Sequence, residues 1–513
     1  MEENIDIPDL EQIHDLATAK FLLKHVVAAL EAQTRALEAQ TRTIEELRHE
    51  IGELKRALFG KKSERVVPVE REISARQRRE ETPEQRAARM AEAQRKRDDR
   101  RTQRRKAVPT EVVEHPVVEE MCDACGASLD DAASVADEVS EEYEYVPARI
   151  VRREHHRQRV VCACGAFHYG EVPKRVIEGG LYGPGLHAHV VVSKCADSMP
   201  LDRLSRRVRR AGAPLSRSTL CDLFHRSAEL LAPLADRILA LVAESSHINA
   251  DETSIRVQDK KVCRRAYLWD FIATDDAGHT LVAYRFSADR SGETPIRVLG
   301  QSTGVLQVDG YTGYNQVTTP EKRTRAGCWA HARRKFFDAI EQTPDQAQHA
   351  LDLIRGLYEV EYEAAGNGAL GSERHAALRR TRSRALLRSF YRWAEDERAK
   401  HRPTSPLGVA IRYAINQRAS LERFIEDPKI RLDNNIAEQH LRLIALGRKN
   451  FLFLGHDDAG RNLAVLQTLV STCIANDVNP QAYLADVLMR VAEHPHRELD
   501  ALLPWRWASE TRA

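Results

Sequence analysis

The sequence predicts a multidomain α+β protein in which helical segments flank one β-rich core. Three observations support this prediction: apolar residues recur every seven positions near the N-terminus, short β-rich segments cluster in the middle, and helical patterns fill most of the rest. The chain of 513 residues is too long for one hydrophobic core, so we expect about three or four structural units.

The first predicted unit, residues 1–59, is a long coiled-coil helix. A heptad seam of this length is typical of a helix that pairs with another helix, so it predicts a homo-oligomer or a helical partner. The alternative is a helix that packs on the protein's own core. The seam positions are Leu16, Leu23, Leu30, Leu37, Ile44, Ile51 and Leu58.

Residues 60–108 are predicted to form a charged linker. They are rich in Arg, Lys, Glu and Gln and contain few large apolar residues, so they cannot bury a core of their own. The basic run QRKRDDRRTQRRK leaves two interpretations open. It is a solvated linker, or it is an arm that contacts DNA phosphates.

Residues 109–175 contain two cysteine pairs that predict a structural zinc site. A Cys-x-x-Cys pair followed about 40 residues later by a second pair has the general form of such a site. The second pair is Cys-x-Cys, and three nearby histidines are alternative ligands: His155, His156 and His168. A small β unit with free cysteines and no metal is the alternative. The four cysteines are Cys122, Cys125, Cys162 and Cys164.

Residues 176–245 are predicted to form a helical segment that resembles a helix-turn-helix DNA-binding unit. Prolines open the first two helices, a Gly-Ala-Pro turn precedes the third, and Ser216 or Ser218 would cap it. An ordinary helical bundle with a charged face is the alternative. Five basic residues lie near the turn: Arg206, Arg207, Arg209, Arg210 and Arg217.

The β-rich region predicts an RNase H-like core over residues 246–462. Three segments read as consecutive antiparallel strands: HINADETSIRV, RAYLWDFIATD and HTLVAYRFS. A helix (GETPIRVLG), a strand (GVLQVDGY), a short strand (RAGCWAH) and a helix (ARRKFFDAI) follow. This is the element order of an RNase H-like fold. Residues 343–430 are predicted to be an all-α insertion that covers or clamps DNA, and residues 463–513 a C-terminal helical domain.

Three acids stand where nucleases and transposases of this fold carry their metal ligands. Asp251 lies in the first strand, Asp309 ends the fourth strand, and Glu438 lies on a later helix that begins near Asn435. Phosphodiester chemistry with two divalent ions requires hard oxygen ligands, so Mg²⁺ or Mn²⁺ is expected. Taken singly, each acid also fits a purely structural role: an exposed strand residue, a turn former, and a capping box between Asn435 and Glu438.

Basic residues surround these acids and are candidates for holding the DNA backbone. Arg442 follows Glu438 by four residues and therefore shares its helix face. His331 lies close to the metals or is a packed, satisfied histidine. For Arg448 and Lys449 the alternative is a favourable charge pair at a helix C-terminus. The candidate DNA-binding residues are Arg206, Arg217, Arg333, Arg334, Lys335, Arg442, Arg448 and Lys449.

Seven motifs are spread along nearly the whole chain: LFGKKSER (58–65), ADET (250–253), VDGYTGYN (308–315), GCWAHARRKF (327–336), LDNNIAEQHLR (432–442), GRKNFLF (447–453) and STCIANDVNPQAYLADVL (471–488). Together they resemble the large transposase of the IS66 insertion-sequence family. The resemblance implies a DDE transposase that cuts element ends and joins them to target DNA, with Asp251, Asp309 and Glu438 as ligands of Mg²⁺ or Mn²⁺.

The resemblance also implies an N-terminal helical region, a zinc-binding domain and a helix-turn-helix-like segment. Family members act with smaller proteins encoded by the same element, so accessory partners are expected besides terminal-repeat and target DNA. The Cys162–Cys164 pair departs from the family, which more often has a wider second cysteine pair.

Bulk properties agree with a cytoplasmic, nucleoid-associated protein. No apolar run approaches the roughly 20 residues that span a bilayer, and the acidic N-terminus lacks a signal pattern. The net charge of +2 hides an uneven distribution of acids and bases. A DNA-binding regulator derived from an inactive transposase is the competing interpretation, although the intact acid triad argues against it. A structural coiled-coil protein would leave the β-rich core unexplained.

Overall fold

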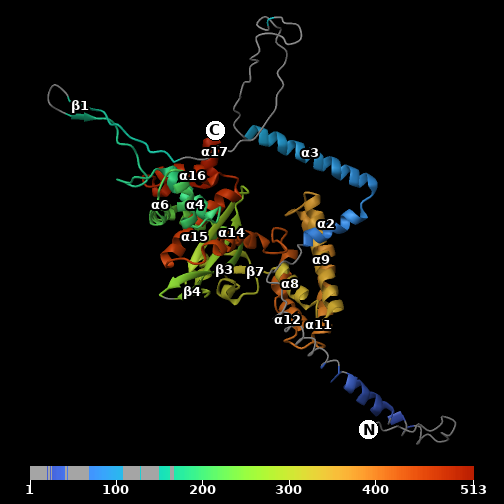
Figure 1. Cartoon of the computed structure of the whole chain (residues 1–513). Helices are drawn as coiled ribbons and strands as arrows, with labels where there is room; N and C mark the ends of the chain where they lie inside the picture. The colour runs from blue at the N-terminus through green and yellow to red at the C-terminus, as the bar shows by residue number, and fades with distance from the viewer. Residues whose placement is uncertain are drawn as a thin grey trace. The chain divides into compact units, whose positions relative to one another are not determined.

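The computed structural model describes residues 26–37, 69–107, 150–161, 167–260 and 262–512, apart from a few isolated positions elsewhere. The chain divides into two compact units. The larger unit, which holds the β-sheet, includes His155–Arg207 and Pro214–Ala513, and the smaller includes Pro68–Glu154. Figure 1 traces the chain through both.

A five-stranded mixed sheet forms the centre of the larger unit. Its strand order is β5-β4-β3-β6-β7, in which β3, β4 and β5 are antiparallel neighbours and β6 and β7 run parallel to β3. The three predicted antiparallel strands are therefore confirmed. The strands are β3 His247–Asp259, β4 Val262–Thr274, β5 Thr280–Ser287, β6 Gly304–Gln307 and β7 Arg323–Ala326.

The prediction of the last strand is only partly correct. RAGCWAH was expected to be extended, but β7 ends at Ala326 and helix α8 (Trp329–Ala339) begins three residues later. The tryptophan is fully buried and its indole N–H donates to the carbonyl of Leu421, 2.9 Å away. Packing against the inserted helices therefore decides the conformation of an apolar segment that is too short to show a clear period.

Short crossovers place β6 next to β3. Helix α7 (Glu293–Leu299) connects β5 to β6, and the 3-10 helix η2 (Thr312–Val317) connects β6 to β7. Gly304 starts β6 with a φ of 110°, and a Cβ there would lie 2.3 Å from the carbonyl oxygen of Ser246. Only glycine permits this approach, which lets the amide of Val305 donate to the same oxygen.

Helix α15 (Asp457–Ala475) covers the sheet edge formed by β5. Thr468 and Thr472 accept hydrogen bonds from the amides of Tyr284 and Val282, at 2.9 and 3.2 Å. These side chains satisfy backbone groups that an uncovered edge strand would leave unpaired. The helix crosses the predicted boundary at residue 462, and α16 (Pro480–Arg490) and α17 (Pro504–Arg512) follow it.

Helices form most of residues 343–430, the predicted insertion between α8 and α14 (Asn435–Phe451). Figure 1 shows α8, α9, α11 and α12 gathered into one bundle. Its core contains edge-to-face aromatic contacts of Phe390 with Trp329 and Phe336. The inserted elements are α9 Pro344–Gly366, α10 Glu373–Leu378, the π-helix η3 Arg379–Ser383, α11 Arg384–Arg398, α12 Pro406–Asn416, α13 Arg418–Leu421 and the 3-10 helix η4 Arg423–Ile425.

The helices predicted within 176–245 are also present. They are α4 (Pro184–Cys195), α5 (Leu201–Arg210) and α6 (Arg217–Glu244). Ser216 is the cap of α6, because its hydroxyl accepts a hydrogen bond from the amide of Thr219 at 3.0 Å.

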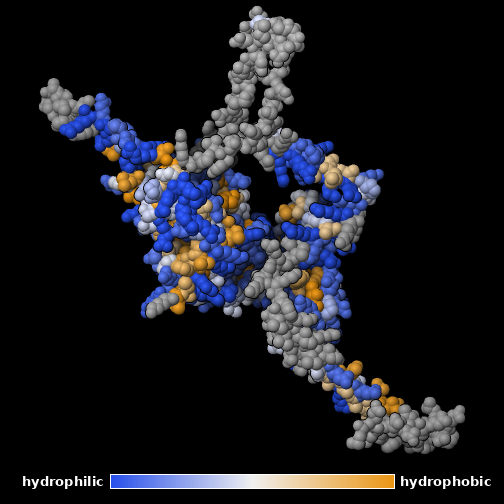
Figure 2. Space-filling model, in the orientation of Figure 1, coloured by the Kyte–Doolittle hydropathy of each residue, from blue (hydrophilic) through white to orange (hydrophobic). Residues whose placement is uncertain are grey.

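The smaller unit contains two helices where a charged linker was expected. They are α2 (Val69–Glu80) and α3 (Pro83–Ala107). A capping box starts α3, since the Thr82 amide donates to Gln85 Oε1 and the Gln85 amide donates to Thr82 Oγ1. Arg, Lys, Glu, Gln and Ala are strong helix formers, so the charged composition favours a helix without a core. Figure 2 shows mainly hydrophilic residues along the visible side of α3.

Several predictions fall on residues outside the described ranges. Of the heptad seam only Leu23, Leu30 and Leu37 are described. All three are helical, and their side chains are exposed. The four cysteines of the predicted zinc site are not described; the strands β1 (Arg159–Val161) and β2 (Phe167–Tyr169), on either side of the second pair in the sequence, are described and pair with each other. No helix in the described part of the chain could span a bilayer.

Candidate active site

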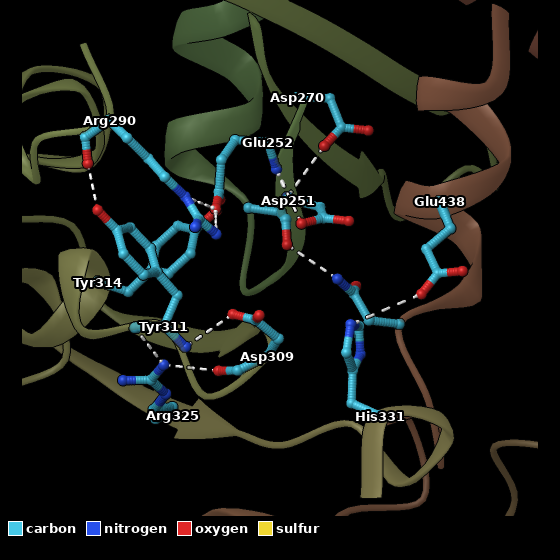
Figure 3. A network of polar contacts seen from close by, with 12 residues as sticks. Asp251, Glu252, Asp270, Arg290, Asp309, Tyr311, Tyr314, Arg325, His331 and Glu438 are labelled. Carbon is cyan, nitrogen blue, oxygen red and sulfur yellow. Dashed lines mark hydrogen bonds and ion pairs between the residues drawn. The ribbon is translucent and has the colours of Figure 1, made fainter. Parts of the chain in front are cut away.

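Asp251 and Asp309 occupy neighbouring positions on parallel elements of the sheet. Asn249 on β3 is in register with Gln307 on β6, and each acid lies two residues further along its own segment. Two residues carry a strand back to the same face, so both acids stand at the same level. Asp309 lies just beyond the end of β6. Figure 3 shows the two side chains on adjacent segments.

Glu438 reaches the same region from helix α14. The cap residue of this helix is Asn434, so Glu438 occupies the fourth helical position and not the third, which a capping box requires. The side chain of Asn434 makes no capping bond. It donates instead to the carbonyl of Ala250 on β3 and accepts from Asn249, both at 2.8 Å. The start of the helix is thereby fixed to the strand that carries Asp251, and Glu438 is not part of a capping box.

His331, on helix α8, is a basic group close to Glu438. Its Nε2 lies 3.9 Å from Glu438 Oε1, a distance for an electrostatic contact and too long for a hydrogen bond. Its other ring nitrogen, Nδ1, is buried and has no hydrogen-bond partner among the described residues. His331 therefore lies beside the acids, and it is not a fully satisfied core histidine.

The neighbouring acids influence the ionisation of Asp251. Burial and the negative charges of Glu252, Asp309 and Glu438 together raise the pKa of Asp251 to about 8, against a hydrogen bond from the Glu252 amide that lowers it. Because these charges act on Asp251, Asp309 and Glu438 both lie within electrostatic reach of Asp251. A cation among them would relieve this repulsion.

Asp270 is a fourth acid that the sequence interpretation did not single out. It lies directly opposite Asp251 in the β3–β4 ladder, is completely buried, and accepts a hydrogen bond from the Asp251 amide at 2.9 Å. Its Oδ2 has no partner among the described residues. Burial and the neighbouring charge of Asp251 raise the pKa of Asp270 well above its ordinary value.

Glu252, the residue after Asp251, belongs to a second polar cluster with Tyr314 and Arg290. Tyr314 donates to its Oε2 at 2.7 Å, and Arg290 donates to its Oε1 at 2.8 Å. The guanidinium of Arg290 also lies 4.0 Å from the ring centre of Tyr311. Burial raises the pKa of Glu252 in spite of these hydrogen bonds. The cluster ties β3 to the loop after Asp309 (Figure 3).

The loop that carries Asp309 is held from two sides. Asp309 Oδ1 accepts from the amide of Tyr311 at 2.8 Å, and Arg325 on β7 donates to the carbonyls of both residues at 2.6 Å. A carboxylate on a loop with these bonds has a fixed position, which a metal ligand requires.

The predicted DNA-binding residues differ in accessibility. Arg333 is only 6% exposed in this conformation, and its phosphate contact stays a prediction. Arg448 is half-buried and donates to Thr253 Oγ1 and the Ser254 carbonyl on β3. Arg334 and Lys335 are half-buried, and Lys335 lies over the Tyr413 ring. Four residues are exposed: Arg206, Arg217, Arg442 and Lys449.

The donor set suits a hard divalent cation. Carboxylate oxygens are the side-chain ligands that Mg²⁺ and Mn²⁺ prefer, and the residues that would hold such ions are Asp251, Asp309 and Glu438. In the part of the chain that the structure describes, no three His, Cys, Asp or Glu side chains converge closely enough to enclose an ion. The acids are thus neighbours with mutual repulsion, and they do not form a closed ligand cage.

Comparisons with known proteins decide the family. The profile described as "Transposase IS66 family" matches residues 179–462, which is more than half of the chain and includes all three acids. The chain belongs to the IS66 transposase family. Three further profiles of the family match as well: the "IS66 C-terminal element" (468–505), the "zinc-finger binding domain of transposase IS66" (119–165) and the "Transposase C of IS166 homeodomain" (46–113).

Relatives of this chain occur in Sinorhizobium fredii. The uncharacterized protein y4hP is 32% identical over 424 residues, which cover 78% of this chain and 75% of the relative. The uncharacterized protein y4qI is 36% identical over 351 residues, 65% of this chain and 64% of the relative. Membership of the family implies a transposase-type nuclease, and the matched zinc-finger and homeodomain regions indicate DNA as a partner.

Proposed function

We propose that this chain is a DDE transposase that binds the ends of its insertion sequence and catalyses metal-dependent strand cleavage and strand transfer. Asp251, Asp309 and Glu438 would hold the Mg²⁺ or Mn²⁺ ions. The observation that carries the proposal is the placement of Asp251 and Asp309 at one level of the sheet, with Glu438 brought to them by a helix anchored on the same strand.

The proposed catalytic core has an RNase H-like fold. Three antiparallel strands followed by two strands parallel to the first, in the order β5-β4-β3-β6-β7, agree with that fold. The domain boundaries expected from the sequence are part of the same proposal, with a helical insertion between the second and third acids.

The protein's own groups would hold and orient the reacting DNA. When bound, two divalent ions supply activation of the attacking oxygen and stabilisation of the leaving oxygen. The backbone contact from Asp251 to Asp270 and the bond from the Tyr311 amide to Asp309 keep two ligands in place before DNA arrives. Preorganised ligands lower the cost of assembling the site during reaction.

DNA would be held by exposed basic residues around the acids and on the insertion. Arg442 and Lys449 lie on the helix of Glu438, and Arg206 and Arg217 lie on α5 and α6. Helix α11 adds arginines that sequence reasoning did not single out. Three of them follow at intervals of four residues, are exposed, and have no acidic partner among the described residues: Arg384, Arg388 and Arg392. Like charges at this spacing destabilise an isolated helix, so bound phosphates would compensate them.

Zinc, oligomerisation and accessory proteins complete the proposal. Cys122, Cys125, Cys162 and Cys164 lie within or at the end of the matched zinc-finger region and are its proposed ligands. The exposed leucines of the heptad seam are the proposed oligomer contact. Smaller proteins of the same element are proposed partners on the basis of the family alone.

The competing function is a DNA-binding regulator without catalysis. Purified full-length protein, incubated with DNA that carries the inverted repeats flanking its gene, distinguishes the two. We expect nicking and joining with Mg²⁺ or Mn²⁺ and none with EDTA, and no reaction on a duplex whose repeats are scrambled. Repeat-specific binding without cleavage under every metal condition would favour the regulator.

A further inference from the structure

A strained turn follows helix α14, about 20 Å along the helix from Glu438. Leu452 has a φ of 59° and a ψ of −48°, and the amide of Phe453 donates to the carbonyl of Phe451 at 2.6 Å. These values define a γ-turn with positive φ, which is rare and strained for a residue with a side chain. Glycine would be expected here, and leucine is found.

Neighbouring contacts on both sides hold the turn in this conformation. Before it, Asn450 donates to the carbonyl of Ser198 at 3.1 Å, and the ammonium of Lys194 lies 4.2 Å from the ring centre of Phe451. After it, Leu454 pairs with β3, since its amide donates to the Arg256 carbonyl at 2.8 Å. A strained residue that the surroundings fix on both sides is a frequent feature of functional sites.

The turn exposes two apolar side chains in a basic environment. Leu452 is 63% exposed and Phe453 is 43% exposed. Because side chains alternate along a strand, Phe453 lies on the same face as Arg256, beside the pair formed by Leu454 and Val257. Lys449, one helical turn before Leu452, is exposed as well.

A pair of like charges extends this surface. Arg256 on β3 lies directly opposite Arg265 on β4, both side chains are exposed, and neither has an acidic partner among the described residues. Like charges directly opposite each other destabilise a strand pair. A polyanion bound across the two strands would remove this repulsion.

We propose that Leu452 and Phe453 form an apolar wedge that packs against a base step of DNA, while Arg256, Arg265 and Lys449 hold the flanking phosphates. Apolar side chains that insert at a base step are used by proteins that bend or open a duplex. The wedge goes beyond the proposed transposase function and rests on its DNA-binding part. It does not depend on the metal ions.

DNA fits this surface better than a protein partner does. An apolar protein contact would favour neutral residues around it. The wedge is bordered instead by Arg256, Arg265 and Lys449, which have no acidic partner among the described residues. Phosphates on either side of a base step supply the complementary charge. A second copy of the chain, or another protein, is the other possible occupant and is an outcome of the test.

The test compares two duplexes of the same mixed sequence, one fully paired and one with a central mismatch, bound by the full-length protein in EDTA. Unstacking costs less at a mismatch, so the wild-type protein should prefer the mismatched duplex. Leu452→Gly together with Phe453→Ala should abolish that preference and weaken binding to the mismatched duplex by about tenfold. Arg256→Gln with Arg265→Gln should weaken both duplexes alike.

Controls separate a DNA contact from a role in folding. Leu452→Gly alone relieves the positive-φ strain, so its thermal midpoint should stay or rise while the mismatch preference falls. Leu370→Ala, which truncates another exposed leucine, should change neither the thermal midpoint nor the mismatch preference. An unchanged preference in the Leu452→Gly, Phe453→Ala variant would overturn the wedge. The wedge would also be overturned if this double variant kept its DNA binding but changed its oligomeric mass, measured by light scattering. The two side chains would then contact protein and not DNA. Failure of cleavage alone would bear on the proposed catalysis and not on this result.

Discussion

The backbone amide of Asp251 donates a hydrogen bond to the buried carboxyl of Asp270, 2.9 Å away on the adjacent strand. Replacement by leucine would leave this amide unsatisfied in the core. We predict that Asp270→Leu lowers the free energy of unfolding by about 1–3 kcal/mol, whereas Asp270→Asn, which retains an acceptor oxygen, costs less than about 1 kcal/mol. Urea denaturation measures both. Equal stability of the two variants would contradict a role for this bond.

The stability of the metal-free protein should depend on pH through Asp251. Burial and the charges of Glu252, Asp309 and Glu438 raise the pKa of this group to about 8 from 3.8. The protonated carboxyl is the form favoured in the fold, so its contribution is complete below the ordinary pKa and is lost as pH rises through about 8.

We therefore predict that the thermal midpoint in EDTA falls between about pH 6 and pH 8, and that Asp251→Asn reduces this fall. Mg²⁺ should raise the midpoint more at the upper end of the range, since it binds the ionised carboxylate. Identical pH profiles for Asp251→Asn and the wild-type protein would contradict the assignment.

Asn434 should matter for catalysis although it carries no charge. Its side chain connects α14 to β3 through Ala250 and Asn249, and its backbone N–H donates to the sulfur of Cys328. We predict that Asn434→Ala reduces turnover by about 10- to 100-fold with DNA affinity unchanged, because Glu438 loses its fixed position.

Asn476→Ala is the matched control for Asn434→Ala. Asn476 makes two comparable bonds, between α15 and Thr280 on β5, far from the acids in the sheet order. The variant should lose stability and keep its turnover per folded molecule. Equal losses of turnover in both variants would show that Asn434 acts only through stability.

The arginines of α11 should contribute to DNA affinity through phosphates. Each phosphate that a protein neutralises adds roughly 0.9 to the slope of log affinity against log salt, so conversion of Arg384, Arg388 and Arg392 to Gln should reduce this slope by about 2.7. A matched triple variant changes three exposed arginines that already have acidic partners: Arg380, Arg382 and Arg398. Equal slopes in both triple variants would rule out a specific role for Arg384, Arg388 and Arg392.

The sequence predicted the sheet because its strands have clear patterns and turns. The three antiparallel strands, α7 and the helices within residues 343–430 occur where they were expected, whereas β6 ends at Gln307, two residues before Asp309. The buried acid Asp270 was within reach of the same reasoning. The tight connection between β3 and β4 fixes their register, and this register places Asp270 opposite Asp251.

Other features depend on contacts distant in sequence, which local patterns do not contain. No local signal shows that threonines of α15 satisfy the edge of β5, or that Asn434 binds β3 and leaves the helix start uncapped. The basic run that contains Arg333 does not show that the fold buries this side chain, which is 6% exposed. The helix α3 does not depend on distant contacts, since its Thr82–Gln85 capping box is visible in the sequence. It was missed because a charged segment without a hydrophobic core was interpreted as a linker.

The most direct test of the central claim is strand cleavage and transfer by Asp309→Asn, measured on terminal-repeat DNA beside the wild-type protein. The amide keeps the size of the side chain but is a poor ligand for two cations, so cleavage and joining should fall below detection while repeat-DNA affinity is retained. An Asp309→Asn protein with wild-type cleavage would contradict the assignment of the three acids as metal ligands.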